Sequence, residues 1–203
     1  MSRPATRRAG RNKEDVLAAA CQVIAERGAD ATRFQDVARS SGVPVSTLQY
    51  YFGSREDLLV AAFRHASQAE LAAIAKDLAS IEDPWARLTR VVDTALTGYD
   101  LESSGTGRLW IEAWRFGMRD PEMREDVHRD YARWRALIAG EVRAGITVGR
   151  FHTGLPPERV AVLALAVLDG LGIPLAVGDP EVSPAEARRT ALAALADLLR
   201  VAG

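Results

Sequence analysis

Residues 45–51 contain the side chains with the most specific chemistry in this sequence. Ser46, Thr47 and Gln49 can each donate and accept hydrogen bonds, as the recognition of exposed base edges in DNA requires. The side chain of Val45, or the methyl group of Thr47, could contact the methyl group of a thymine. These residue types in one short run predict a surface that reads DNA bases.

Three neighbouring side chains fit contacts to the phosphate backbone of DNA. Tyr50 and Tyr51 can donate their hydroxyl groups to phosphate oxygens while their rings pack against the sugars. Arg55 falls in the first turn of the helix that follows, where the helix macrodipole disfavours a cation. A nearby phosphate would offset that cost, because arginine binds phosphate well. Taken alone, Arg55 fits a solvated surface cation; beside the polar run, we favour the phosphate contact.

The polar run lies on the second of two short helices. The first is expected to begin at Thr32, where residues 32–35 fit a capping box closed by Gln35. Residues 40–42 are Ser-Ser-Gly and form a short turn, and the second helix covers residues 46–52. Two short helices joined by a glycine-containing turn predict a helix-turn-helix, whose second helix can enter the major groove.

Helical apolar spacing continues through the rest of the chain, and no run of useful length alternates as a strand does. We therefore predict an all-α fold of about nine helices, in which a three-helix head is joined through a long helix to a helical body. The other helices are expected from Asn12 to Gly28, from Ser54 (with Asp57 at the capping position) to about Ser80, from Asp83, through Leu109 and Trp114, from Asp120, and over residues 157–177 and 183–201.

The charges of the chain are divided unevenly. Residues 1–52 carry eight Lys and Arg against five Asp and Glu, whereas the whole chain has a net charge of −1. A basic head concentrates the attraction for phosphate. We predict a DNA-binding domain over residues 1–53 and an effector-binding and dimerisation domain over residues 54–203. The N-terminal arm either follows the minor groove or phosphates, or is a solubilising tail. Its cations are Arg3, Arg7, Arg8, Arg11 and Lys13.

Two features bear on the cellular compartment. The single cysteine, Cys21, excludes an intramolecular disulfide framework and suits a reducing compartment. Residues 1–13 are basic but lack the apolar stretch of a secretory signal. Both features favour a cytoplasmic protein.

The run over residues 32–59, TRFQDVARSSGVPVSTLQYYFGSREDLL, closely resembles the signature of the tetracycline-repressor (TetR) family. The shared pattern is a Thr-started helix with a Val-Ala pair, a Ser-Gly-Val turn, a Thr-Leu run ending in an aromatic residue and Phe, and a closing Leu-Leu. The Leu-Asp-Gly-Leu-Gly run over residues 168–172 is also similar to that family. The resemblance implies a ligand-responsive transcriptional repressor.

The resemblance also implies which residues contact DNA. By position, base or groove contact is implied for Gln35, Val45, Ser46, Thr47 and Tyr50, and phosphate contact for Thr32, Gln49, Tyr51 and Arg55. The sequence departs from the family pattern at several of these positions. Gln49 stands where the family usually has Tyr, Tyr51 where it often has His, and Arg55 replaces Lys with the charge kept. Pro44 takes the place of a common Ser cap. These departures leave the operator sequence open.

Residues 160–168 are apolar almost all round, which for a helix indicates burial on more than one side. A transmembrane helix is not expected, because Asp169, Gly170, Gly172 and Pro174 break the run short of the ~20 residues needed to cross a bilayer. A core helix and a subunit interface are the alternatives that remain.

The final helix is the natural partner of this apolar run. In the TetR family this pair of helices meets its copy in a four-helix bundle, so the resemblance implies a homodimer. A dimer can set two recognition helices about 34–36 Å apart, as successive major grooves of a palindromic operator require. The residues expected at the interface are Val160, Leu163, Val167, Leu171, Leu192, Leu195 and Leu199.

All four tryptophans lie in the predicted body. Together with nearby aromatic and methionine side chains they are typical material for an apolar ligand pocket, although ordinary core packing is the alternative for each of them. We expect a small apolar or aromatic effector. The residues expected to line its pocket are Tyr99, Trp110, Trp114, Phe116, Met118, Met123, Tyr131 and Trp134.

An enzyme is the first competing class. His65, His128 and His152 are scattered, and Glu125 with His128 forms only half of a di-iron helix motif. We therefore predict no metal, no cofactor and no catalytic site. The other alternative is a helical adaptor that binds only protein. An adaptor has no need of a capped helix-turn-helix with outward polar side chains.

Overall fold

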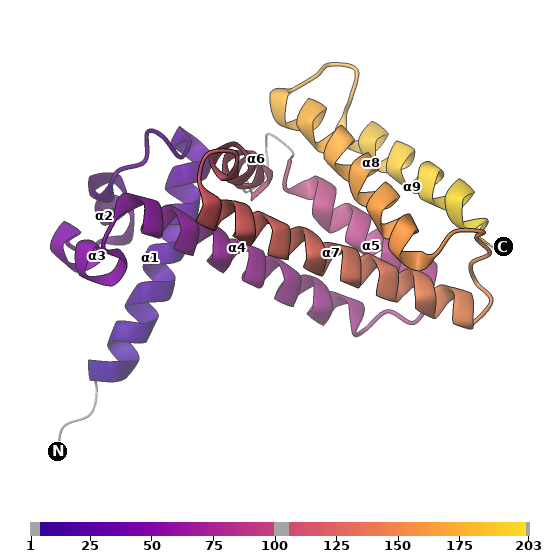
Figure 1. Cartoon of the computed structure of the whole chain (residues 1–203), viewed down its shortest axis with the longest axis horizontal. Coiled ribbons are helices and arrows are strands. Elements are labelled where there is room, and N and C mark those ends of the chain that lie inside the picture. The colour runs from indigo at the N-terminus through magenta and orange to yellow at the C-terminus, as the bar shows by residue number, and fades with distance from the viewer. Residues whose placement is uncertain (1–4, 100–105, 202–203) are drawn as a thin grey trace. The chain divides into compact units, whose positions relative to one another are not determined.

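The computed structural model describes residues 5–99 and 106–201, with side chains for 13–99 and 107–201. Within these ranges the chain forms nine helices and no strand, which confirms the predicted all-α fold (Figure 1). The helices are α1 (Ala5–Arg27), α2 (Phe34–Ser41), α3 (Val45–Phe52), α4 (Arg55–Leu78), α5 (Pro84–Thr97), α6 (Thr106–Gly117), α7 (Pro121–Thr147), α8 (Pro157–Val177) and α9 (Pro184–Leu199).

The helices group into two compact units. Unit 1 comprises the described part of residues 1–69 together with 108–127, and unit 2 comprises 70–107 and 128–203 as far as they are described. Helices α4 and α7 therefore contribute residues to both units. The functional boundary predicted after residue 53 stays a prediction. The compact units are divided elsewhere, because unit 1 extends to residue 69 and includes residues 108–127. The reason lies in the core of unit 1, where α1, α2 and α3 pack against α4 and against Leu109 of α6.

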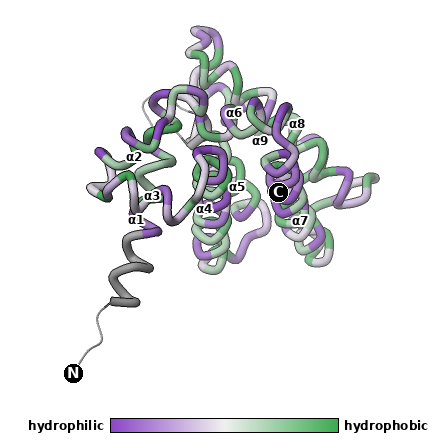
Figure 2. The backbone as a smooth tube through the Cα atoms, turned by 60° about the vertical axis from the view of Figure 1, so that its left-hand side comes forward, coloured by the Kyte–Doolittle hydropathy of each residue, from purple (hydrophilic) through white to green (hydrophobic). Residues whose placement is uncertain are grey.

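Capping residues explain where several helices begin. Ser54 and Asp57 exchange hydrogen bonds at the start of α4, and Asp83 accepts from the Ala86 amide at the start of α5. Asp120 and Ser183 do the same for α7 and α9. Each cap satisfies a backbone amide that the first helical turn leaves without a partner. Along the helices hydrophilic and hydrophobic residues alternate in the tube of Figure 2, as helical spacing predicts.

Two predicted helix starts are wrong. Helix α1 begins at Ala5, so Asn12 lies inside it, because the preceding Ala- and Arg-rich residues are themselves good helix formers. Helix α2 begins at Phe34, where Asp36, and not Gln35, accepts from the Arg33 amide at 3.3 Å. Of the predicted basic arm, Arg3 lies outside the described residues, as do the side chains of Arg7, Arg8 and Arg11.

Helix α8 covers residues 157–177, as the sequence predicts. It runs without a break over 21 residues, and Asp169, Gly170, Gly172 and Pro174, which were expected to shorten its apolar run, lie inside it. By length and composition alone this helix could cross a membrane. In unit 2 it lies beside α9 (Figure 1) and its side chains Val160, Ala161 and Leu168 are buried. These buried residues fit the core-helix alternative of the sequence analysis.

Candidate DNA-binding interface and effector site

Helix α3 has one buried face and one exposed face. Leu48 and Phe52 are buried in the core of unit 1, one helical turn apart. Gly42, with a φ of 71°, ends α2 and turns the chain toward α3. Because the two apolar side chains fix the rotation of α3, its polar positions are turned outward.

The structure brings most of the predicted DNA-contacting residues together around α3. Tyr50 is highly exposed, at 86% of its surface. The other exposed members are Gln35, Ser46 and Gln49, and the half-buried members are Val45, Thr47, Tyr51 and Arg55. The three exposed residues of α3, with Gln35 from α2, therefore form a polar surface of the kind that base recognition needs.

Thr32 is the exception in this set. The residue is fully buried, and its hydroxyl donates to the carbonyl of Gly28 at 2.9 Å. Its amide in turn donates to the carbonyl of Ala29 at 3.3 Å. The phosphate contact implied for Thr32 has no exposed donor in this structure, and Thr32 acts instead as an internal brace of the α1–α2 turn.

Arg55 serves a purpose that the sequence did not reveal. Its guanidinium donates from Nε to the carbonyl of Thr32 at 2.7 Å and from Nη2 to the carbonyl of Ala29 at 2.5 Å. The remaining nitrogen pairs with Glu56 at 2.9 Å. Arg55 thus ties the first turn of α4 to the α1–α2 turn. A phosphate contact by the same guanidinium stays a prediction.

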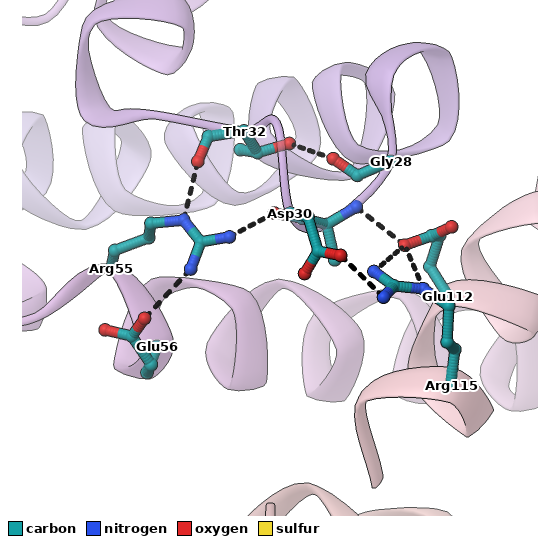
Figure 3. A network of polar contacts seen from close by, with 8 residues as sticks. Gly28, Asp30, Thr32, Arg55, Glu56, Glu112 and Arg115 are labelled. Atoms are coloured by element: carbon teal, nitrogen blue, oxygen red, sulfur yellow. Dashed lines mark hydrogen bonds and ion pairs between the residues drawn. The ribbon is translucent and has the colours of Figure 1, made fainter. Parts of the chain in front are cut away.

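Two residues of α6 hold the same turn from another direction (Figure 3). Glu112 Oε2 accepts from the amide of Ala29 at 2.7 Å, and Arg115 donates to Asp30 at 2.6 Å and to Glu112 at 2.9 Å. The bonded Arg115 lowers the pKa of Asp30 below its ordinary value. The sequence analysis missed Glu112 and Arg115, because a contact across 83 residues to a backbone amide leaves no local pattern.

The predicted pocket residues divide between the two units. Trp110, Phe116 and Met123 pack in unit 1 with Phe63, whose ring meets that of Trp110 edge-on at 4.8 Å between centroids. Trp114 also belongs to unit 1. Met118 is 75% exposed. The packing of Trp110, Phe116 and Met123 fits the core-packing alternative, and a pocket role for these residues stays a prediction.

Unit 2 contains the other predicted aromatic residues together with a half-buried acid, Asp169. Tyr99 and Trp134 are buried, and the Tyr131 hydroxyl donates to Asp169 Oδ2 at 2.7 Å. Burial raises the pKa of Asp169 above its ordinary value, and burial followed by the charge of Asp169 raises the pKa of Tyr99. This aromatic–acid cluster (Tyr99, Tyr131 and Asp169) joins α7 and α8 to the end of α5.

Gly172 leaves room for the ring of Tyr99. A Cβ atom at position 172 would lie 2.8 Å from Tyr99 Cε2, which is closer than two carbon atoms can pack. In the sequence, the run that contains Asp169 and Gly172 stands out as a family resemblance and as a break in an apolar stretch. In the structure, this run of α8 supplies Asp169, the acid of the aromatic–acid cluster, and Gly172, which leaves room for the ring of Tyr99.

The residues predicted for the dimer interface fall into two groups. Val160, Leu195 and Leu199 are buried within the chain itself, whereas Leu163, Val167, Leu171 and Leu192 are half-buried. Helix α8 has a separate exposed stripe that the sequence analysis missed, and its members recur every three or four residues. They are Val162, Ala166, Gly170, Ile173 and Val177.

Comparison with known proteins identifies the family. Residues 16–62 match the family model for bacterial regulatory proteins of the tetR family, and residues 84–200 match that for the BetI-type transcriptional repressor C-terminal domain. The chain is 28% identical over 163 residues to the HTH-type transcriptional regulator BetI of Burkholderia thailandensis, covering 78% of each chain. It is 29% identical over 168 residues to BetI of Rhizobium meliloti, covering 79% of this chain and 76% of that one.

A solved structure has a similar fold over most of the chain. A transcriptional regulator from Saccharomonospora viridis, determined in complex with choline, has a TM-score of 0.83 and 27% identity, covering 93% of this chain and 96% of that one. These findings confirm a regulator in place of an enzyme or an adaptor. The chain belongs to the TetR family of bacterial regulatory proteins, with a BetI-type repressor C-terminal domain, and is a DNA-binding transcriptional regulator.

Proposed function

We propose that this regulator is a cytoplasmic homodimeric repressor that leaves a palindromic operator when a small organic cation binds in unit 2. The observation that carries the effector class is the aromatic–acid cluster. Asp169 supplies a negative charge, and Tyr99 and Tyr131 supply aromatic rings, whose faces attract cations. The choline bound by the Saccharomonospora relative is a cation of this kind.

The cluster refines the expected chemistry of the effector. Aromatic side chains alone fit the apolar or aromatic effector that the sequence analysis expected. A carboxylate that is partly removed from water is costly unless something compensates its charge, and this partial burial already raises the pKa of Asp169. A quaternary ammonium compensates the charge without requiring hydrogen bonds, and its methyl groups suit an aromatic surround. Choline is therefore the first effector to test.

The exposed stripe on α8 supports the homodimer. Val162, Ile173 and Val177 are 41%, 50% and 72% exposed, which is unusual for large apolar side chains on one helical face. Ala166 and Gly170 between them are small and allow a second helix to approach closely. A copy of α8 has the same self-complementary surface, as a two-fold interface requires. We propose this stripe, extended by the half-buried Leu163 and Val167, as the dimer face.

Operator release requires that the effector bind one conformation of the dimer better than another. The effector can shift DNA affinity by no more than that difference in its own affinity. Helix α4 is unbroken over 24 residues and contributes to both units, so it is the element that we propose as the lever. The test is solution scattering of the DNA-free dimer with and without an effector that releases DNA. A profile that the effector leaves unchanged would contradict the lever.

The function is tested with the DNA immediately upstream of the gene. Mobility-shift titrations at several salt concentrations, with random DNA of equal length as control, measure affinity and specificity. The expected result is specific binding that weakens with rising salt and is relieved by choline at low millimolar concentration or below. Binding without preference for the upstream DNA would overturn the operator proposal, and specific binding that choline leaves unchanged would overturn the effector class.

A further inference from the structure

We propose that Glu112 of α6 is a positioning residue for DNA binding, which acts by fixing the Ala29 peptide in the turn that leads into the helix-turn-helix. The inference rests on the proposed DNA-reading role of α2 and α3. It does not depend on the identity of the effector. All the residues that carry it belong to unit 1.

The Ala29 peptide groups are held from two sides. The amide of Ala29 donates to Glu112 Oε2 at 2.7 Å, and the carbonyl of Ala29 accepts from Arg55 Nη2 at 2.5 Å (Figure 3). Glu112 comes from α6 and Arg55 from the first turn of α4. One residue of the turn is therefore clamped between two helices, and both bonds involve a charged side chain, which makes them stronger than neutral ones.

The carboxylate of Glu112 is itself held in place. Arg115, one turn further along α6, donates to Glu112 Oε2 at 2.9 Å and 3.3 Å and reaches Asp30 of the turn at 2.6 Å. Only 21% of the Glu112 side chain is exposed. Gly28 lies against the same carboxylate, since a Cβ there would be 3.5 Å from Glu112 Oε1. This support restricts Glu112 to the position in which it meets the Ala29 amide.

The clamped turn determines where α2 begins. Only four residues separate Ala29 from the start of α2 at Phe34, and both Ala29 and Thr32 are buried. The carbonyl of Thr32 is the second acceptor of Arg55, at 2.7 Å. A turn this short and this well bonded cannot move without moving α2, and α2 packs directly on the recognition helix α3. The position of α6 is thereby transmitted to the DNA-reading surface.

The experiment compares three variants with the wild-type protein. Glu112→Ala removes the acceptor. Glu112→Gln keeps an oxygen that can accept from the Ala29 amide and loses only the charge. Glu122→Ala is the control, because it removes the same charge from unit 1 by deleting an exposed carboxylate that pairs with Arg64. Any general effect of a lost negative charge on DNA attraction therefore appears equally in Glu112→Ala and Glu122→Ala.

The first measurement is hydrogen exchange of the Ala29 amide in the DNA-free protein, followed by NMR. Glu112→Ala is expected to speed exchange at Ala29 on the order of tenfold or more, whereas Glu112→Gln and Glu122→Ala stay within about threefold of the wild type. Unchanged exchange in Glu112→Ala would overturn the inference, whatever the DNA results.

The second measurement is the ratio of affinities for upstream and random DNA. Glu112→Ala is expected to lower this ratio about tenfold, with most of it restored in Glu112→Gln and none lost in Glu122→Ala. A loss of folded protein alone would lower both affinities together and leave the ratio unchanged. An unchanged ratio in a folded Glu112→Ala variant overturns the inference, whereas a wild-type protein without preference for upstream DNA contradicts the proposed function instead.

Discussion

The Tyr131 hydroxyl donates a 2.7 Å hydrogen bond to the carboxylate of Asp169, which joins α7 to α8 at the aromatic–acid cluster. Burial is the largest cause of the raised pKa of Asp169, and the bond from Tyr131 partly opposes it. Such a carboxylate is costly to keep ionised in the free protein. A bound cationic effector would stabilise the ionised carboxylate and so offset that cost.

Asp169→Asn should abolish the choline response and leave operator binding intact. The asparagine oxygen can still accept from Tyr131, so the cluster keeps its shape and loses its charge. Because the raised pKa means that ionised Asp169 destabilises the folded state at neutral pH, the thermal midpoint should not fall. Mobility shifts with and without choline, together with thermal unfolding, check both parts. A variant that still releases DNA with choline would exclude Asp169 as the cation-binding group.

The choline response should weaken at acidic pH. Protonation of Asp169 removes the charge that attracts the cation, and its pKa lies above the ordinary 3.8. As pH falls through that raised pKa, the dissociation constant for choline should rise by about tenfold per pH unit. Calorimetric titrations of the DNA-free protein from about pH 8 to about pH 4 measure it. A dissociation constant that does not rise as the pH falls would contradict Asp169 as the group that holds choline.

Gly172→Ala should reduce choline affinity by displacing the ring of Tyr99. The added Cβ would lie 2.8 Å from that ring, so either Tyr99 or α8 must shift. Gly140→Ala in α7 is the matched control, because a Cβ there meets no atom within 4 Å. Both substitutions raise helix propensity by about 1 kcal/mol, so only the contact with Tyr99 distinguishes them. Equal choline affinities in the two variants, measured by calorimetry, would exclude Tyr99 from the site.

The sequence predicts the helical framework well because its signals are local. Asp83 and Asp120 cap the helices that they were expected to start, and the spacing of Leu48 and Phe52 sets the outward face of α3. For α2 the sequence predicts a start that is too early, because Thr32 is a capping type of residue but braces the turn instead. A threonine can either cap a helix or bond to a neighbouring turn, and the sequence alone does not say which of the two it does.

The long-range contacts were beyond sequence reasoning. Arg55 and Glu112 bind backbone groups of the α1–α2 turn, and backbone groups are the same at every residue. The pair of Tyr131 and Asp169 spans 38 residues on two helices. The aromatic residues of the body could be recognised as pocket material, but their division between two units depends on packing that no spacing rule describes.

Ile173→Asp should convert the protein to a monomer. Ile173 lies on the exposed stripe of α8 and is 50% exposed, so a charge there costs little in the single chain. At a dimer face, the same charge would lose its water and meet its copy across the two-fold axis. Val148→Asp, at another exposed apolar residue outside the stripe, is the control. Sedimentation equilibrium distinguishes the two, and a dimeric Ile173→Asp variant would contradict the proposed face.

Tyr50 allows the mode of DNA contact to be distinguished. Its side chain is 86% exposed, so Tyr50→Ala should change the free energy of unfolding by no more than about 0.5 kcal/mol. Operator affinity should nevertheless fall about tenfold, the effect of losing one hydrogen bond to a charged group. Because a phosphate contact uses the hydroxyl and a groove contact uses the ring, Tyr50→Phe separates the two.

If Tyr50 donates to a phosphate, Tyr50→Phe should weaken binding as much as Tyr50→Ala, and equally on upstream and random DNA. If the ring lies in the groove, Tyr50→Phe should retain most of the affinity for upstream DNA. Fluorescence anisotropy with labelled duplexes measures both affinities at one salt concentration. Wild-type affinity in both variants would remove Tyr50 from the interface. Because its side chain is 86% exposed on the outward face of α3, the predicted orientation of the recognition helix would then be wrong.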